Sequence, residues 1–382
     1  MKARAQALVP KLRERAAACE AQGEMPDQTF EELQSAGLFK LSQPAKFGGY
    51  ELGFDVGIEM VMELARGCGS SAWVYGILQD HQSLAAMYPA EAQDEVWSAA
   101  PQALVASSFM PAGKATPQSG GYRLSGRWSF SSGSRFASWI ILGCMLPPSE
   151  PGAAPLMSMM LVPKRDFRIE PNWNVIGLRG TGSNDIVVDD AFVPSHRILS
   201  VADANEGRNP GRHCHAGAVF ARPFAATSTF TLCAPAVGIA AGAVERFVEE
   251  MSARESRGSR LAELATVQLR VAESSAEVDA GRLLIERCVR EAQQTLERGE
   301  PLTLDERARN RRDGPFAVGL MISAVDRLHR GAGGQALHAA HPLARAFRDV
   351  HAVGAHLYTS WDIAGTTYGR VALGLPPGSP IV

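Results

Sequence analysis

Paired cysteines, clustered metal ligands and an excess of either charge are all missing from this sequence. Its 6 cysteines are scattered over 382 residues without a Cys-x-x-Cys pair. That scatter argues against a disulfide framework or a zinc site and fits thiols kept reduced in the cytoplasm. His213-Cys214-His215 is a dense run of metal-ligand types, but its glycine and arginine neighbours favour a loop. The 38 lysines and arginines against 40 acidic residues leave a net charge of -2, so we expect no nucleic-acid partner.

Long hydrophobic stretches are scarce too. The start of the chain carries Lys2, Arg4, Lys11, Arg13 and Arg15 without a continuous apolar run, so we expect no signal peptide. Residues 223–244 lack charge over a length that could cross a bilayer, yet they are mostly small and include two prolines. We interpret them as a buried helix at a tight interface, and expect a cytoplasmic protein with no membrane role.

A Rossmann fingerprint is absent as well. Gly177, Gly180 and Gly182 crowd into one short segment, but they precede an expected strand and no helix opens on them. Two interpretations stay open for this segment. It is either a flexible turn, or a loop whose backbone and Arg179 contact a ligand or a neighbouring domain.

Helical signals dominate up to about residue 100. Pro26 and Gly37 bracket a first helix, a second is expected from Asp55 to Arg66, and a third follows the break at residues 67–69. His81 lies on the third helix. A lone histidine there is more often a satisfied core residue than a catalyst.

Between residues 102 and 200 the pattern changes to short apolar or alternating runs separated by glycine and proline. Such runs predict strands, and their spacing predicts a small barrel or sandwich. The expected strands are 104–109, 122–131, 139–146, 156–162 and 186–193.

The stretch 128–139 combines features of a strand and a turn. Bulky and small polar side chains alternate up to Gly133, where a bend or a close approach of the backbone to a ligand is easiest. Ser131 and Ser132 offer hydroxyls at this bend, and Trp128, Phe130 and Trp139 offer apolar walls, so a planar cofactor could lie there. An ordinary hairpin with its serines facing water is the alternative interpretation.

From about residue 224 onward the sequence again indicates helices. Leu264, Val271, Val278 and Ile285 recur every seven residues, forming an apolar seam that requires partner helices. Helices over 224–253, 303–330 and 342–366 would complete a four-helix bundle. The expected domains are therefore an N-terminal helical domain at 1–101, a central β domain at 102–205 and the bundle at 206–382.

Five motifs stand in order along these domains. They are Cys-Gly-Ser-Ser-Ala-Trp at 68–73, Trp-Ser-Phe-Ser-Ser-Gly at 128–133, the glycine-rich run at 175–184, Phe-Arg-Asp-Val-His-Ala at 347–352, and Gly-Leu-Pro-Pro-Gly at 374–378. With these motifs the chain resembles the oxygenase components of two-component flavin-dependent monooxygenases, such as those hydroxylating a phenolic secosteroid or p-hydroxyphenylacetate. The resemblance implies the α+β acyl-CoA dehydrogenase-like fold, with a helical domain, a β domain and a four-helix bundle.

The resemblance also implies an activity. An oxidoreductase of this kind hydroxylates a phenolic or other aromatic substrate with diffusible reduced FMN or FAD and O₂, through a C4a-hydroperoxyflavin and without a metal. A separate NAD(P)H-dependent flavin reductase would supply the reduced flavin. The matching flavin contacts are Trp73, Ser107, Ser108, Phe109, Phe130, Ser131, Ser132, Arg254, Gly333, Gly334, Gln335, His356 and Leu357.

Three positions match the family's catalytic residues. Ser132 matches the hydroxyl that faces flavin N5, His356 the histidine near the flavin, and His81 the histidine on the substrate side. The chain departs from the secosteroid enzyme after Gly133, where a longer polar run is replaced by a segment containing Arg135 and Phe136. We therefore expect these two residues at the substrate, with Arg135 available for an acidic group.

The resemblance leaves other points open. Arg254 has Arg257 and Arg260 close by, and no pattern decides which of them contacts the flavin. In this fold such an arginine often reaches a cofactor held by a neighbouring subunit. Small residues between Ala225 and Ala243 permit close helix approach, so we expect a homotetramer, a dimer of dimers.

Three other functions compete with aromatic hydroxylation. An N- or S-oxygenating monooxygenase of the same fold would have little use for a phenol-activating histidine. An acyl-CoA dehydrogenase would need a carboxylate base over its flavin, with Asp362 as a candidate. A non-catalytic binding module is the third.

Overall fold

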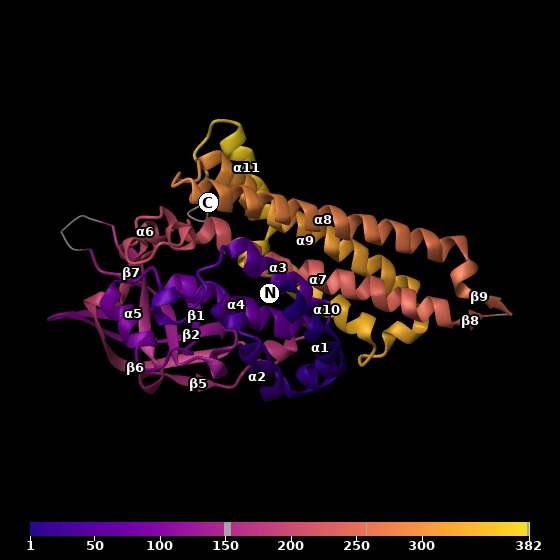
Figure 1. Cartoon of the computed structure of the whole chain (residues 1–382), viewed down its shortest axis with the longest axis horizontal. Coiled ribbons are helices and arrows are strands. Elements are labelled where there is room, and N and C mark those ends of the chain that lie inside the picture. Colours follow the sequence, from indigo (N-terminus) through magenta and orange to yellow (C-terminus); the bar gives the residue numbers. More distant parts are fainter. Residues whose placement is uncertain (149–153, 257, 380–381) are drawn as a thin grey trace.

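The computed structural model describes residues 1–148, 154–256, 258–379 and 382. An N-terminal group of helices and a sheet lie together at one end of the molecule, and a bundle of long helices extends beyond them (Figure 1). The N-terminal helices are α1 (Lys2–Gln22), α2 (Asp27–Ser35), α3 (Phe54–Ala65), α4 (Gly69–Ala85) and α5 (Ala90–Trp97). The predicted helices 26–37, 55–66 and that after residue 69 are thus confirmed as α2, α3 and α4.

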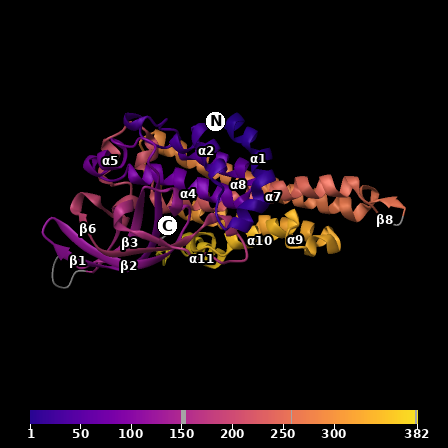
Figure 2. The ribbon, with the colours of Figure 1, turned by 90° about the horizontal axis from the view of Figure 1, so that it is seen from below.

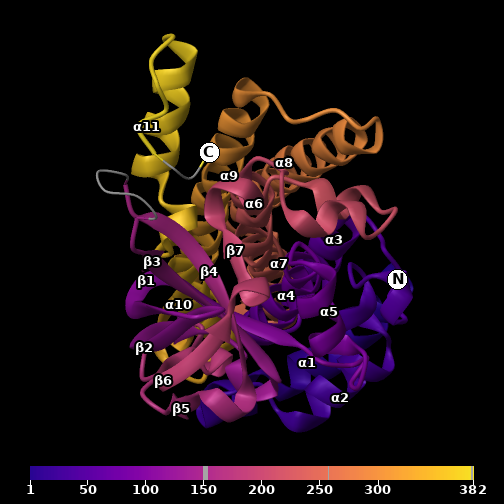
Figure 3. The same ribbon diagram turned by 90° about the vertical axis from the view of Figure 1, so that its left-hand side faces the viewer.

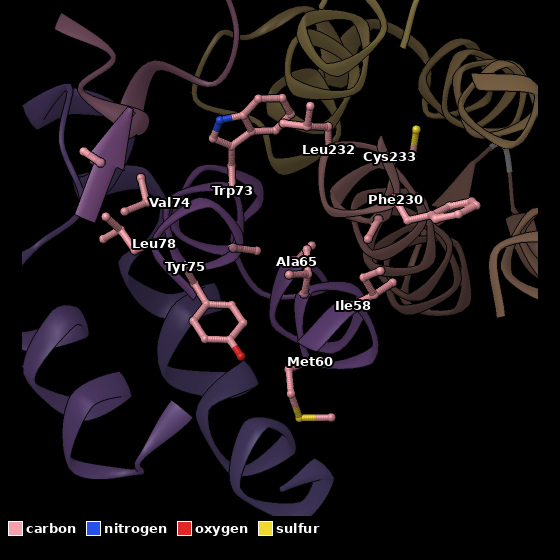
Figure 4. Close-up of a cluster of buried hydrophobic side chains, with 14 of the residues drawn as sticks. Ile58, Met60, Ala65, Trp73, Val74, Tyr75, Leu78, Phe230, Leu232 and Cys233 are labelled. Carbon is pink, nitrogen blue, oxygen red and sulfur yellow. The ribbon is translucent and has the colours of Figure 1, made fainter. Parts of the chain in front are cut away.

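Helix α4 is the central helix of this group. All of its residues except Ile77 are buried, because it contacts strand β1 on one side and the bundle helix α7 on another. Figure 4 shows Val74 and Leu78 pointing from α4 toward a strand, while Trp73 and Tyr75 leave the helix on different sides. One helix therefore carries side chains into both of its neighbouring layers.

Seven strands form one sheet in the order β5-β6-β2-β1-β3-β4-β7. Pairing is antiparallel except between β1 and β3, which run parallel. The five predicted strands are confirmed, and two short strands extend the sheet at its edges. The strands are β1 (Val105–Gln118), β2 (Gly121–Ser131), β3 (Trp139–Leu146), β4 (Leu156–Pro163), β5 (Arg168–Glu170), β6 (Asn184–Pro194) and β7 (Ile198–Ser200).

Two irregularities in strand pairing fall where ligand contacts are expected. The β1–β3 register shifts between Ser108 and Gly113, and the β2–β6 register shifts between Trp128 and Ser131. Such irregularities bend a strand and redirect its side chains. In Figure 3 the strands fan out beside the bundle helices.

The bundle consists of long helices that reach beyond the sheet, with a small β8–β9 hairpin at the far tip (Figures 1 and 2). Helix α7 is long and apolar enough to span a membrane, but 94% of its apolar window is buried inside the protein. This burial agrees with the predicted core helix. The elements are α6 (Val201–Asn205), α7 (Phe224–Ala253), β8 (Glu255–Ser256), β9 (Ser259–Arg260), α8 (Ala265–Glu297), α9 (Leu304–Gly331), α10 (Pro342–Gly354) and α11 (Trp361–Ala372).

Two predictions about the bundle need correction. The seven-residue seam is buried at Val278 and Ile285, but Leu264 precedes α8 and is 42% exposed. The single helix predicted over 342–366 is wrong, because α10 ends at Gly354 and α11 begins at Trp361. A short 3₁₀ turn at Leu357–Thr359 separates them, and α11 projects away from the sheet (Figure 3).

Side chains stabilise the break between α10 and α11. Thr359 Oγ1 donates to the carbonyl of Val353 at 2.6 Å, and the backbone N–H of Tyr358 donates to Nδ1 of His356 at 3.2 Å. These bonds satisfy backbone groups that a helix end leaves unpaired. The break therefore places His356 at a helix junction.

Candidate functional site

A contact between α4 and the end of β2 forms the centre of the site. Trp73 Nε1 donates to Ser132 Oγ at 3.0 Å. The next residue, Gly133, has φ 68°, and a Cβ there would lie 2.8 Å from a methyl group of Val74. A left-handed backbone and this close approach both favour glycine. The predicted bend at Gly133 is thus confirmed.

The residues around this bend have unused binding capacity. Ser131 Oγ is buried and has no hydrogen-bond partner among the described residues, although buried hydroxyls are normally paired. Phe130 takes a left-handed φ of 67° and leaves 68% of its surface exposed, with its ring 6.0 Å from that of Trp173. An orphaned hydroxyl beside an exposed aromatic ring fits a planar ligand with a polar edge, such as a flavin.

His356 lies across from this contact, with its ring centroid 5.7 Å from that of Trp73. Burial and the nearby positive charge of Arg311 lower the pKa of His356 to about 4, so the ring is neutral at physiological pH. Nδ1 accepts the N–H of Tyr358. The single ring proton is therefore on Nε2, and His356 is a hydrogen-bond donor at that atom.

Arg311 holds the turn that carries His356. Its guanidinium is buried and donates to the carbonyl of Leu357 at 3.3 Å and to Thr229 Oγ1 at 3.4 Å. It also donates to the carbonyl of Tyr358. No carboxylate pairs with it among the described residues. A buried charge that binds only neutral acceptors keeps its electric field, which is why it acts on the pKa of His356.

His81 forms a second cluster, on the side of α4 that faces β1. Its Nδ1 lies 3.0 Å from the carbonyl of Val105, and its Nε2 lies 3.2 Å from Ser107 Oγ. Because a carbonyl only accepts, the ring proton is on Nδ1 and Nε2 accepts from Ser107. Burial lowers the pKa of His81. The ring of Phe109 stands edge-on at 5.7 Å, so this acceptor pair faces an aromatic wall.

Ser108 and Leu357 are sequence neighbours of Ser107 and His356, which belong to the two clusters. Ser108 Oγ donates to the carbonyl of Ser129 at 2.7 Å, linking β1 to β2 beside the predicted contacts. Leu357 is adjacent to His356 and 45% exposed. The structure thus places predicted residues in two clusters, one around Ser132 and one around His81, and α4 contributes Trp73 to the first and His81 to the second.

Arg135 and Phe136 lie elsewhere. The guanidinium of Arg135 pairs with Asp27 at 2.8 Å and with Glu24 at 3.5 Å, and Phe136 stacks on Phe30 at 4.4 Å. These contacts tie the β2–β3 connection to α2. The structure does not bring either residue into the His81 cluster.

Arg254 and the turn at 333–335 are also separate from Ser132 within one chain. Arg254 Nη1 donates to the carbonyl of Ala332 at 3.2 Å and to Glu250 at 2.8 Å, at the end of α7 farthest from the sheet (Figure 1). Helix α7 has 30 residues, which span roughly 45 Å. A Cβ added at Gly333 or Gly334 would meet no other atom within 4 Å. Arg257 lies outside the described residues, and Arg260 is in β9.

Three features narrow the chemistry of the site. Asp362, the candidate dehydrogenase base, is exposed at the start of α11. Over the described ranges, no group of three or more histidine, cysteine or acidic side chains is placed to hold a metal. A hollow of about 690 Å³ lies on the sheet near β5 and β6, but its arginines and aspartates pair with one another, as in Arg123–Asp190.

Sequence reasoning missed three polar residues of the Ser132 cluster. Ser183 Oγ lies 2.8 Å from Ser132 Oγ, Thr181 Oγ1 lies 2.7 Å from Ser183 Oγ, and Asp349 binds the same loop from α10. Thr181 and Ser183 belong to the glycine-rich motif 175–184, and Asp349 belongs to the motif 347–352. The motifs marked these stretches, but nothing in them indicated that they meet.

The chain is similar to known proteins over most of its length. The N-terminal domain model of acyl-CoA dehydrogenases matches residues 2–98, and the C-terminal domain model matches residues 230–361. The FADH₂-dependent resorcinol hydroxylase oxygenase component of Rhizobium sp. (strain MTP-10005) is 40% identical over 90% of this chain and 87% of its own. The crystal structure of 3-HSA hydroxylase from Rhodococcus sp. RHA1 matches with a TM-score of 0.94 and 35% sequence identity. The match covers 99% of this chain and 98% of the hydroxylase chain. XiaF from Streptomyces sp., in complex with FADH₂ and glycerol, matches with a TM-score of 0.89 and 27% sequence identity. The match covers 99% of this chain and 96% of the XiaF chain.

Proposed function

Because this chain belongs to the family of flavin-dependent monooxygenase oxygenase components built from acyl-CoA dehydrogenase domains, we propose that it hydroxylates a phenolic or other aromatic substrate. Reduced FMN or FAD, when bound, would supply the two electrons that activate O₂, so that one atom of O₂ is transferred to the substrate and the other is released as water. The observation that carries this proposal is the His81–Ser107 acceptor pair beside Phe109. An aromatic wall with one acceptor suits a ring bearing a hydroxyl group.

The His81 cluster would activate a phenol by taking its proton. Ser107 donates its own proton to His81 Nε2, so its oxygen is left to accept the O–H of a phenol. His81 then receives the proton through Ser107, and the phenolate oxygen raises the electron density of the ring at its ortho positions. Proton transfer by a positioned base of this kind is typically worth about 10² to 10⁴ in rate.

The Ser132 cluster would hold the flavin. Trp73, Phe130 and Leu357 offer apolar contact, while Ser131 and Ser132 offer hydroxyl groups. His356 offers an N–H donor from the opposite side. Trp73, Ser131 and Ser132 are buried, and exclusion of water from them would strengthen their hydrogen bonds.

The partners follow from a diffusible cofactor. An NAD(P)H-dependent flavin reductase delivers the reduced flavin, and the protein acts in the cytoplasm as a homotetramer, a dimer of dimers. Arg254 and the turn at 333–335 then contact a flavin held by a neighbouring subunit. The open space at Gly333 and the 80% exposure of Leu337 support this assignment. A monomeric mass by light scattering at micromolar concentration would contradict it.

Turnover with a substrate panel tests the proposed function. The protein is incubated with a flavin reductase, NADH, FMN or FAD, and phenols with and without an acidic group, together with one aromatic amine and one thioether. Mass spectrometry is expected to show a gain of one oxygen on a phenol. Oxygen gained only by the amine or the thioether would assign the chain to N- or S-oxygenation instead, and preference for acidic phenols would support the placing of Arg135 and Phe136 near the substrate.

A further inference from the structure

Two sequence motifs that the proposed function leaves unused meet at one hydrogen bond. Asp349, on α10, accepts the backbone N–H of Leu178 at 2.7 Å, and its carboxylate is buried. The partners are 171 positions apart in the chain. The bundle and the glycine-rich loop of the β domain are therefore joined next to Ser132.

Asp349 holds Leu178 in a strained conformation. Leu178 has φ 51°, a left-handed value that is unfavourable for a branched side chain. Its carbonyl accepts from Trp173 Nε1 at 3.1 Å, from Thr181 N at 3.2 Å and from Thr181 Oγ1 at 2.9 Å. Hydrogen bonds on both of its peptide groups thus hold the carbonyl of Leu178 in a fixed place.

This fixed carbonyl sets the direction of a chain of hydroxyls. A carbonyl only accepts, so the single proton of Thr181 goes to Leu178. Ser183 must then donate to Thr181 across 2.7 Å, and Ser132 must donate to Ser183 across 2.8 Å. Trp73 Nε1 donates to Ser132 from the other side. Ser132 has therefore used its proton and one of its two lone pairs, and it can only accept from a further partner.

We propose that Asp349, Thr181 and Ser183 are positioning residues that make Ser132 an obligatory acceptor, so that the site selects reduced over oxidised flavin. N5 of a reduced flavin carries a proton and can donate it to Ser132. N5 of an oxidised flavin carries only a lone pair and meets another lone pair. This inference rests on the proposed flavin site, but it concerns binding and not oxygen transfer.

Affinity for the two redox forms of the flavin tests the direction of the chain. Dissociation constants for FMN and FAD are measured in air and, after reduction with dithionite, under anaerobic conditions. Thr181→Val leaves Ser183 without its acceptor and lets the chain reverse, so that Ser132 can donate. The preference for reduced flavin is expected to fall about tenfold, the effect of one neutral hydrogen bond. Thr181→Ser keeps the hydroxyl and is expected to keep the preference.

Two further variants distinguish an effect on the hydrogen-bond chain from an effect of misfolding. Ser183→Ala ends the chain one residue earlier and is expected to lower the preference as Thr181→Val does. Thr295→Val, a buried threonine of α8 that binds Arg298 at 3.2 Å, is the matched control and is expected to leave the preference unchanged. Thermal unfolding identifies which variants are folded. An unchanged preference in folded Thr181→Val and Ser183→Ala overturns the proposal.

The anchoring role of Asp349 has its own pair of variants. Asp349→Asn retains an oxygen that accepts from Leu178 and is expected to keep the preference within about twofold. Asp349→Ala removes the acceptor, releases the strained Leu178, and is expected to lower the preference about tenfold. An equal preference in the two folded variants removes Asp349 from the proposal.

These outcomes are separable from failure of the proposed function. Absence of an oxygenated product with every substrate, together with a lowered preference in Thr181→Val, would reject aromatic hydroxylation and retain the hydrogen-bond chain. Formation of a hydroxylated product, together with an unaltered preference in Thr181→Val, would retain aromatic hydroxylation and reject the hydrogen-bond chain.

Discussion

His81 and His356 are alike in almost every respect except the one that decides their chemistry. The ring of His81 is buried and His356 is partly buried, and burial lowers the pKa of each. Both bind the backbone through Nδ1, but His81 meets the carbonyl of Val105 and His356 meets the N–H of Tyr358. Their Nε2 atoms therefore have opposite roles: that of His81, on the proposed phenol side, is an acceptor, and that of His356, on the proposed flavin side, is a donor. In each case one backbone group determines which ring nitrogen carries the proton, and therefore whether Nε2 donates or accepts.

The two histidines also differ in how they are held. His81 is part of a continuous helix that packs on β1, so its backbone is fixed by regular structure. His356 sits at the break between α10 and α11, where Arg311 and Thr359 supply the missing contacts. We expect a change at His81 to act mainly on chemistry, and a change around His356 to act on local order as well.

Replacing the acceptor is expected to have the largest effect. His81→Ala removes the base, so hydroxylated product is expected to fall by about 10² to 10⁴, while NADH consumption continues and hydrogen peroxide rises. Product and peroxide are measured in the same reaction. His215→Ala is the control, because His215 is partly buried and binds Gln93 at 2.5 Å, outside both clusters. An unchanged yield of hydroxylated product in His81→Ala would show that His81 is not the base and would end the comparison.

The hydroxyl of Ser132 comes next. Ser132→Ala deletes one oxygen beside Trp73 without opening a large cavity, so the protein is expected to fold normally. Losing one preorganised hydrogen bond costs about 10² to 10³ in the step that it serves, and we expect that loss as peroxide released in place of product. The same ratio of peroxide to product in variant and parent would show that Ser132 is not the group facing N5.

Replacing the donor is expected to have a smaller effect. His356→Ala is expected to lower product about tenfold, the value of one neutral hydrogen bond, and to affect product more than NADH consumption. His356→Gln restores an N–H group at a similar reach and is expected to recover part of the yield. If His356→Ala loses as much product as His81→Ala, the two histidines are not specialised in the way that their ring protons indicate.

The last prediction concerns the position of the ring protons. It tests the comparison most directly, and the change in stability that accompanies it is the smallest of the expected effects. Nitrogen-15 NMR of labelled protein is expected to show the proton on Nδ1 for His81 and on Nε2 for His356, with no titration of His356 above about pH 5. Because the folded pKa of about 4 lies below the unfolded value of about 6.5, the folded state binds fewer protons between these values. The free energy of unfolding should therefore rise with pH across this window, and His356→Gln should flatten that rise. Finding both protons on the same ring atom would break the comparison.

More of the fold than of the site is predictable from the sequence. The strands are predictable because alternation is local, and α7 because its small residues lack the leucine and isoleucine density of a membrane span. The break before α11 was missed because the groups that stabilise it come partly from Arg311 on another helix. The bend after β2 is predictable because its serine-rich strand breaks at Gly133.

The Ser132 chain marks the limit of such predictions. Ser183 and Thr181 stood inside a recognised motif, but their roles depend on a left-handed Leu178 and on an aspartate 171 positions away. No local pattern encodes either. Arg135 is a different case: its departure from the related sequence predicts a substrate contact, and because its guanidinium pairs with Asp27 and Glu24 within the chain, that contact stays a prediction.

The seam between the glycine-rich loop and α10 also limits how such enzymes can be recombined. Gly177 lies so close to α10 that a Cβ on it would stand 2.1 Å from the carbonyl of Arg348, one position before the residue that binds Leu178. A chimera that takes its β domain from one relative and its bundle from another places a foreign backbone on each side of this seam. Crossovers between residues 184 and 347 are therefore tolerated only when both parents share the same loop length and the same helix position, whatever their overall identity.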